Sequence, residues 1–167
     1  MWCCVNPDGC QLGLRANANG VDLNRNFPAA NWKEGETVYR WNSAAEERDV
    51  VLLTGDKPGS EPETQALCQL IHRIQPAWVV SFHDPLACIE DPRHSELGEW
   101  LAQAFELPLV TSVGCETPGF SAAGVQISTL HCITAEFPPS PPTKPAKISL
   151  AMANLLRWHP KDAIRPS

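Results

Sequence analysis

The residues best suited to chemistry in this sequence lie in a short polar stretch, G-V-D-L-N-R-N-F-P at residues 20–28. The guanidinium of Arg25 presents a planar fork of donors that matches a carboxylate, and the amide of Asn24 beside it adds a further donor. The stretch holds too few apolar residues for a buried strand, and its Asn and Asp residues disfavour a helix. We therefore predict a structured loop that binds a carboxylate. The alternative is a loop whose Asn side chains only cap its own backbone.

Two further candidates lie where predicted strands end. His83 directly follows the apolar run A-W-V-V-S-F at 77–82, and such a position suits a metal ligand or an acid-base group. A histidine there can also serve structure alone, by donating to a backbone carbonyl. Glu136 lies near the end of a second apolar run, L-H-C-I-T-A-E-F at 130–137. Apolar surroundings disfavour the charged form of a carboxylate, which suits a general base, although Glu136 can also pair with an arginine.

The elements that position these residues alternate between strand and helix. Ser60 and Glu63 predict a capping box, with Pro62 in the first turn, for a helix that runs to Ile74. The other predicted helices are 95–105 and 148–158, and the predicted strands are 1–5, 77–82, 107–113 and 130–137. Because it is a continuous apolar run, the strand at 77–82 is expected to be buried. This alternation predicts an α/β fold with a mixed, largely parallel β-sheet flanked by helices.

The connecting segments are predicted from their turn residues and prolines. Residues 6–9, N-P-D-G, predict a turn after the first strand, and 10–59 predict a long irregular region. Residues 138–146 hold five prolines in nine positions, which excludes a helix or a central strand. Because Met1 stands close to the end of a core strand, we expect the N-terminal part of the fold to be missing.

Composition narrows the class of protein. The 167 residues, 43% hydrophobic and 19% charged, predict one globular domain over 1–167. A net charge of −6 argues against a nucleic-acid partner. No apolar run approaches the roughly 18 residues that span a membrane, and no basic segment precedes an apolar core at the start, so we expect a soluble, cytoplasmic protein. The seven cysteines include no C-x-x-C and predict structural thiols in a reducing compartment.

Four motifs occur in the order and rough spacing of the zinc metallocarboxypeptidase family, which this sequence resembles. They are V-N-P-D-G (5–9), G-V-D-L-N-R-N-F-P (20–28), S-F-H-D (81–84) and T-A-E-F (134–137). The first two, with S-E-P-E-T at 60–64, are most similar to the bacterial branch that trims peptidoglycan peptides. The resemblance covers nearly the whole chain. It implies a zinc-dependent hydrolase whose full-length relatives cut the γ-D-glutamyl–diaminopimelate bond of murein peptides during cytoplasmic recycling.

The resemblance also implies a role for each matching residue. Asn24 and Arg25 correspond to the pair that binds the terminal carboxylate of a murein tripeptide or another small peptide. Glu136 corresponds to the general base, and Arg15, in L-G-L-R-A-N, to the arginine that stabilises the oxyanion. His83 corresponds to the third zinc ligand. Zinc in this family activates its bound water, and carboxypeptidase A is itself a standard example of a two-His, one-Glu site.

The sequence departs from the family in its metal ligands. The family takes its other two ligands from an H-x-x-E motif upstream of V-N-P-D-G, and none of the five His residues begins such a motif. With one of three protein ligands present, we expect weak zinc binding and little or no activity. Residues 115–149 also differ from the family, through a divergent loop or an altered reading frame.

Two other hypotheses remain open. The chain could be a binding domain that holds a peptide carboxylate through Asn24 and Arg25 without zinc. It could also be a truncation product that stays unfolded or chaperone-bound, because missing N-terminal strands would leave a sheet edge bare.

Overall fold

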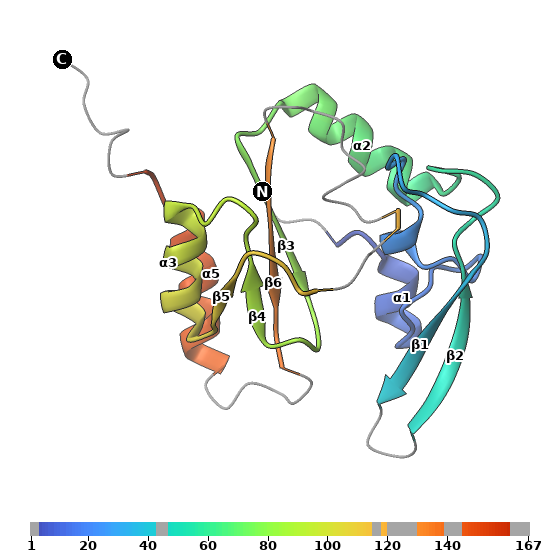
Figure 1. Cartoon of the computed structure of the whole chain (residues 1–167), viewed down its shortest axis with the longest axis horizontal. Helices are drawn as coiled ribbons and strands as arrows, with labels where there is room; N and C mark the ends of the chain where they lie inside the picture. The colour runs from blue at the N-terminus through green and yellow to red at the C-terminus, as the bar shows by residue number, and fades with distance from the viewer. Residues whose placement is uncertain (1–3, 43–46, 115–117, 120–129, 139–144, 161–167) are drawn as a thin grey trace. The chain divides into compact units, whose positions relative to one another are not determined.

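The structure is a computed structural model that describes residues 4–42, 47–114, 118–119, 130–138 and 145–160 (Figure 1). The chain divides into two compact units, each described by itself. We name as the sheet unit residues 78–115 and 131–167 together with Met1, and as the hairpin unit residues 2–77 and 116–130. The single domain expected over 1–167 stays a prediction.

The sheet unit holds a four-stranded mixed sheet in the order β3-β6-β4-β5. The strands are β3 (Trp78–His83), β4 (Cys88–Glu90), β5 (Leu109–Val110) and β6 (His131–Glu136). β3 pairs in parallel with β6 and β4 in parallel with β5, whereas β4 and β6 are antiparallel. This arrangement confirms the predicted α/β class with a mixed sheet. It also adds β4, which was not predicted because three residues are too few to show a strand pattern.

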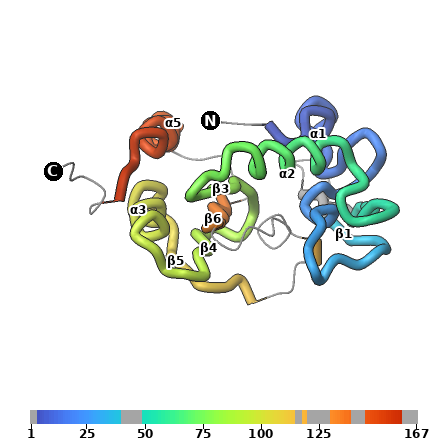
Figure 2. Tube along the Cα trace, turned by 90° about the horizontal axis from the view of Figure 1, so that it is seen from above, coloured from blue at the N-terminus to red at the C-terminus, as the bar shows by residue number. Residues whose placement is uncertain are grey.

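Two helices cover one face of this sheet and lie side by side in both views (Figures 1 and 2). They are α3 (Glu96–Phe105) and α5 (Pro145–Leu155). Ser95 caps α3 as its hydroxyl accepts from Gly98 N at 3.2 Å. The core between helices and strands consists of Ile89, Leu97, Leu101, Phe105, Ile133, Ala135 and Ala151.

Two sequence predictions for this unit need correction. β3 was expected to be buried, but it is half-buried along its whole length because it lies at the edge of the described sheet. α5 begins at Pro145, inside the proline-rich stretch 138–146 from which a helix had been excluded. Proline is tolerated at the first helical position because that N–H has no intrahelical partner. Residues 139–144 of this stretch lie outside the described residues, as does most of 115–129.

The hairpin unit carries the polar loop of residues 20–28. Its elements are α1 (Pro7–Leu12), η1 (Leu23–Arg25, a 3₁₀ turn), β1 (Glu36–Asn42), β2 (Glu47–Leu53) and α2 (Pro62–Ile74). β1 and β2 form an antiparallel hairpin with Val38 opposite Val51. The prediction of an irregular region over 10–59 is therefore wrong in its second half. The hairpin contains four residues that favour strands, Val38, Tyr39, Val50 and Val51. The alternation of apolar and polar residues around them, however, is short.

The start of the hairpin unit also differs from the prediction. Residues 6–9 are not a turn, because Asn6 caps α1 by accepting a hydrogen bond from Gly9 N at 2.9 Å. Of the strand predicted at 1–5, residues 1–3 lie outside the described part, and Cys4 and Val5 belong to no strand.

The capping box predicted at Ser60 is not formed. α2 begins at Pro62, as expected for a proline in the first turn, but its N-cap is Glu61, whose side chain makes no capping bond. Ser60 instead donates its hydroxyl proton to Glu61 Oε1 at 2.6 Å. Across the part of the chain that the structure describes, no helix is both long and apolar enough to cross a membrane.

Candidate functional site

The stretch 20–28 forms the structured loop that its sequence predicts. Asp22 caps η1, since its Oδ1 accepts from Asn24 N at 3.0 Å and its carbonyl accepts from Arg25 N at 2.8 Å. The Arg25 guanidinium donates from Nη1 to the carbonyl of Asn24 at 2.8 Å. One tight turn therefore sets Asn24 and Arg25, both half-buried, next to each other.

Arg15 lies in contact with the same loop. Its Nε donates to Asp22 Oδ2 at 2.8 Å, and its guanidinium carbon lies 5.2 Å from the centre of the Tyr39 ring. The structure thus brings three of the predicted site residues together at Asp22, whose carboxylate accepts from Arg15 and from Asn24 N and whose carbonyl accepts from Arg25 N. Sequence reasoning gave Asp22 no role, although its position two residues before Asn24 is typical of a turn-capping Asp.

Asn26 is the structural residue of the N-R-N sequence, and it was also missed. It is fully buried at 0% exposure. Its Nδ2 donates to Thr54 O and to Ser60 Oγ, each at 2.9 Å, and its Oδ1 accepts from Glu61 N at 3.1 Å. These bonds tie the polar loop to the segment that leads into α2. Partners so far along the chain leave no periodic signal in the sequence.

Glu61 completes this network as a buried carboxylate. It accepts hydrogen bonds from Asn17 and Asn19 at 2.8 Å each and from Ser60 at 2.6 Å. Burial by itself raises the pKa of Glu61, but the bonds from Ser60, Asn19 and Asn17 outweigh it and lower the pKa below its ordinary value. The network therefore holds a negative charge beneath the loop.

In the sheet unit, His83 and Glu136 end two adjacent parallel strands. They are register partners of β3 and β6, so their side chains lie on the same face of the sheet. Phe137 N donates to His83 O at 2.7 Å and closes the ladder just past this pair. Glu136 Oε2 is buried, which fits the expected apolar setting of that carboxylate.

Cys88 of β4 lies opposite Glu136 on the other side of β6. Burial raises the pKa of the Cys88 thiol, and the nearby charges of Glu136 and Glu90 raise it further. Burial also raises the pKa of Cys68 and Cys132, as expected for structural thiols. Cys4 and Cys10 differ, because they are exposed with their Sγ atoms 3.3 Å apart.

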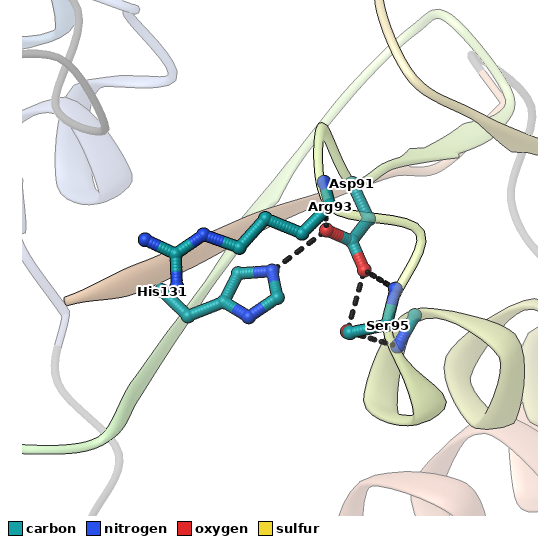
Figure 3. Close-up of polar contacts among 5 residues, drawn as sticks. Asp91, Arg93, Ser95 and His131 are labelled. Atoms are coloured by element: carbon teal, nitrogen blue, oxygen red, sulfur yellow. Dashed lines mark hydrogen bonds and ion pairs between the residues drawn. The ribbon is translucent and has the colours of Figure 1, made fainter. Parts of the chain in front are cut away.

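A second buried polar cluster was not predicted at all (Figure 3). Asp91, which is 0% exposed, lies 2.7 Å from His131 Nε2 through its Oδ1, and its Oδ2 accepts from the Ser95 hydroxyl at 2.6 Å. Burial raises the pKa of Asp91, but the bonds from Ser95, His131 and the Arg93 backbone lower it overall. His131 also packs on Trp78, with ring centres 4.5 Å apart. The bond between His131 and Asp91 connects the start of β6 to the loop before α3.

The donor set of the described residues does not fit a complete zinc site. Nowhere in residues 4–42, 47–114, 118–119, 130–138 and 145–160 do three His, Cys, Asp or Glu side chains converge as metal ligands would. A catalytic zinc ion takes three protein ligands, and the sequence predicts one of them, His83.

Comparison with known proteins gives the family. The sequence profile described as zinc carboxypeptidase matches residues 1–87. Murein peptide amidase A of Escherichia coli (strain K12) is 87% identical over 165 residues, which cover 98% of this chain and 68% of that protein. Murein peptide amidase A of Vibrio campbellii is 54% identical over 135 residues, covering 81% of this chain and 54% of that protein.

Solved structures agree with the sequence comparison. The crystal structure of murein-tripeptide amidase from Escherichia coli O157 superposes with a TM-score of 0.87 at 86% sequence identity. It covers 95% of this chain, and the match spans 68% of that structure. Both the α/β fold and the resemblance inferred from the motifs are thereby confirmed. This chain belongs to the zinc carboxypeptidase family of hydrolases.

Proposed function

We propose that this chain acts as a murein peptide amidase, which hydrolyses the γ-D-glutamyl–diaminopimelate bond of murein peptides. The observation that carries the proposal is the 87% identity to murein peptide amidase A over nearly the whole chain. The natural setting of such chemistry is peptidoglycan recycling in the cytoplasm.

The η1 turn supplies the proposed carboxylate site. The Arg25 guanidinium and the Asn24 amide bind the terminal carboxylate of the peptide, since a planar fork of N–H groups pairs with two carboxylate oxygens. The buried Asn26 behind them limits the motion of the turn, so the donors are ordered before the substrate arrives.

The chemical step is assigned to two further side chains. Glu136 accepts the proton of the attacking water and returns it to the leaving amine of diaminopimelate. Arg15 stabilises the negative oxygen that forms on the scissile carbonyl. His83 is proposed as a zinc ligand because it ends β3 next to Glu136. Among the described residues it lacks the two companions that a catalytic zinc site requires.

That shortage of ligands favours a second candidate function. A domain that keeps Asn24 and Arg25 but holds little zinc would bind a peptide carboxylate without cutting the peptide. The two functions predict the same binding site and differ in turnover.

The deciding experiment uses L-Ala-γ-D-Glu-diaminopimelate with this chain, and murein peptide amidase A of Escherichia coli as reference. Calorimetry measures binding, chromatography measures released diaminopimelate, and metal analysis measures zinc per chain. We expect binding by both proteins, less than one zinc per chain, and slow release of diaminopimelate by this chain. Binding without any release would establish the binding domain instead. Absence of both binding and release would refute both proposals.

A further inference from the structure

Asp22 contacts both Arg15 and the Asn24–Arg25 turn, although it has no role in the assignment above. It is buried at 3% exposure, and its two carboxylate oxygens contact two different parts of the proposed site. We propose that Asp22 is a positioning residue, which fixes Arg15 relative to the Asn24–Arg25 turn. The proposal rests on the proposed function, because it concerns the same hydrolytic site.

Each oxygen of Asp22 has a separate task. Oδ2 accepts from Arg15 Nε at 2.8 Å, and Oδ1 accepts from the backbone N–H of Asn24 at 3.0 Å. The ion pair uses Nε, the guanidinium nitrogen nearest the main chain. It therefore sets the plane of the guanidinium while the terminal nitrogens lie farther out along the side chain. One carboxylate thus orients the oxyanion donor and shapes the carboxylate-binding turn.

The backbone of Asp22 is itself held on β2. Asp22 N donates to Leu53 O at 2.9 Å, and Leu53 N donates to Gly20 O at 3.0 Å, which bridges the loop to the hairpin. Since strands hold a side chain in place better than a loop does, Asp22 is a suitable reference point for its two partners.

Arg15 has further supports that restrict it to this arrangement. Asn6 Nδ2 donates to the carbonyl of Arg15 at 3.0 Å, so the cap of α1 also fixes the Arg15 backbone. The Tyr39 ring lies 5.2 Å from the guanidinium carbon and attracts the cation. Backbone, ring and carboxylate together leave Arg15 with one favoured orientation.

An isosteric substitution of Asp22 distinguishes a positioning role from a role in the stability of the whole fold. Asp22→Asn keeps one oxygen that can cap η1, but its amide N–H₂ would face the Nε–H of Arg15, which places a donor against a donor. Asp56→Asn is the matched control, because it removes the same charge from an exposed residue of the same unit.

The first readout is the Nε–H proton signal of Arg15 in ¹⁵N-labelled protein, assigned by its loss in Arg15→Lys. We expect a signal that exchanges slowly with water in the parent chain and in Asp56→Asn, and that is lost or exchanges rapidly in Asp22→Asn. If Asp22→Asn does not fold, Asp22→Glu, which displaces the carboxylate by one methylene, must shift the same signal. An unchanged signal in the folded variant would overturn the proposal.

The second readout is function with L-Ala-γ-D-Glu-diaminopimelate. Asp22→Asn should lower kcat/KM roughly tenfold to a hundredfold, the range expected for loss of a charge-assisted hydrogen bond. In an Arg15→Ala background the same change should have a much smaller effect, because its target is gone. An equal loss in both backgrounds would show that Asp22 only stabilises the fold. If the parent chain binds the peptide but does not cut it, the proposed hydrolysis fails, and the Nε–H signal still decides the role of Asp22.

Discussion

Replacing Asn26 by alanine tests whether the buried network supports the polar loop. The substitution removes three side-chain hydrogen bonds of 3.1 Å or shorter, to Thr54 O, Ser60 Oγ and Glu61 N. Those three partner atoms would remain near a residue that is 0% exposed, where water does not readily replace the lost amide.

The expected loss follows from the number of bonds. A buried hydrogen bond contributes about 1 kcal/mol net, so three of them predict that the free energy of unfolding falls by roughly 3 kcal/mol. Asn19→Ala is the matched control: Asn19 is exposed and donates one bond, to Glu61 Oε2 at 2.8 Å. For that variant we expect a loss of about 0.5–1 kcal/mol.

Urea unfolding followed by tryptophan fluorescence measures both values, provided that the slopes of the transitions agree. Asn26→Ala should also weaken binding of the murein tripeptide, because Arg25 is the neighbouring residue of the same loop. A loss below about 1 kcal/mol for Asn26→Ala, or equal losses for the two variants, would refute the network argument.

Four other predictions follow from the same geometry. Glu136→Gln should reduce release of diaminopimelate by at least about 10²-fold with tripeptide binding retained, as chromatography and calorimetry would show. Arg25→Lys should weaken tripeptide binding about tenfold in calorimetry, because an ammonium cannot form the two parallel bonds of a guanidinium. Gly119→Ala should lower both thermal stability and tripeptide affinity, since Gly119 has φ +66° and a Cβ there would overlap the carbonyl oxygen of Arg25. The pKa values of Glu61 and Asp91 are lowered in the folded protein. Each carboxylate therefore stabilises the fold fully above its unfolded pKa of about 4, and this effect is lost as the pH falls through the lower folded pKa. The urea midpoint should accordingly fall on acidification, and it should fall less steeply in Asp91→Asn.

Helix α3 of the sheet unit could be predicted from the sequence because its apolar residues recur at the helical period. Leu97, Leu101 and Phe105 recur every four residues after the cap at Ser95, and the helix was found within one residue. The β1–β2 hairpin was missed because charged residues and an exposed valine pair weaken its alternation.

The candidate site residues were chosen by the chemistry of their side chains and their roles stay predictions, whereas the contacts that support them could not be predicted from the sequence. Arg25 and Glu136 carry chemistry that their side chains show directly. Asn26 matters through atoms that only the folded chain brings near, such as Glu61 N, 35 residues along the sequence from Asn26. No local pattern encodes a partner at that separation.

The parallel register of β3 and β6 decides whether His83 and Glu136 lie on the same face of the sheet. Side chains alternate between the two faces of a strand, so a slip of β6 by one residue would turn Glu136 to the opposite face from His83. The same slip would pull His131 away from the buried Asp91 at the other end of the strand. Errors in strand alignment would therefore leave the buried Asp91 carboxylate without its His131 partner as well as misplace Glu136, so the misaligned chain is destabilised during folding.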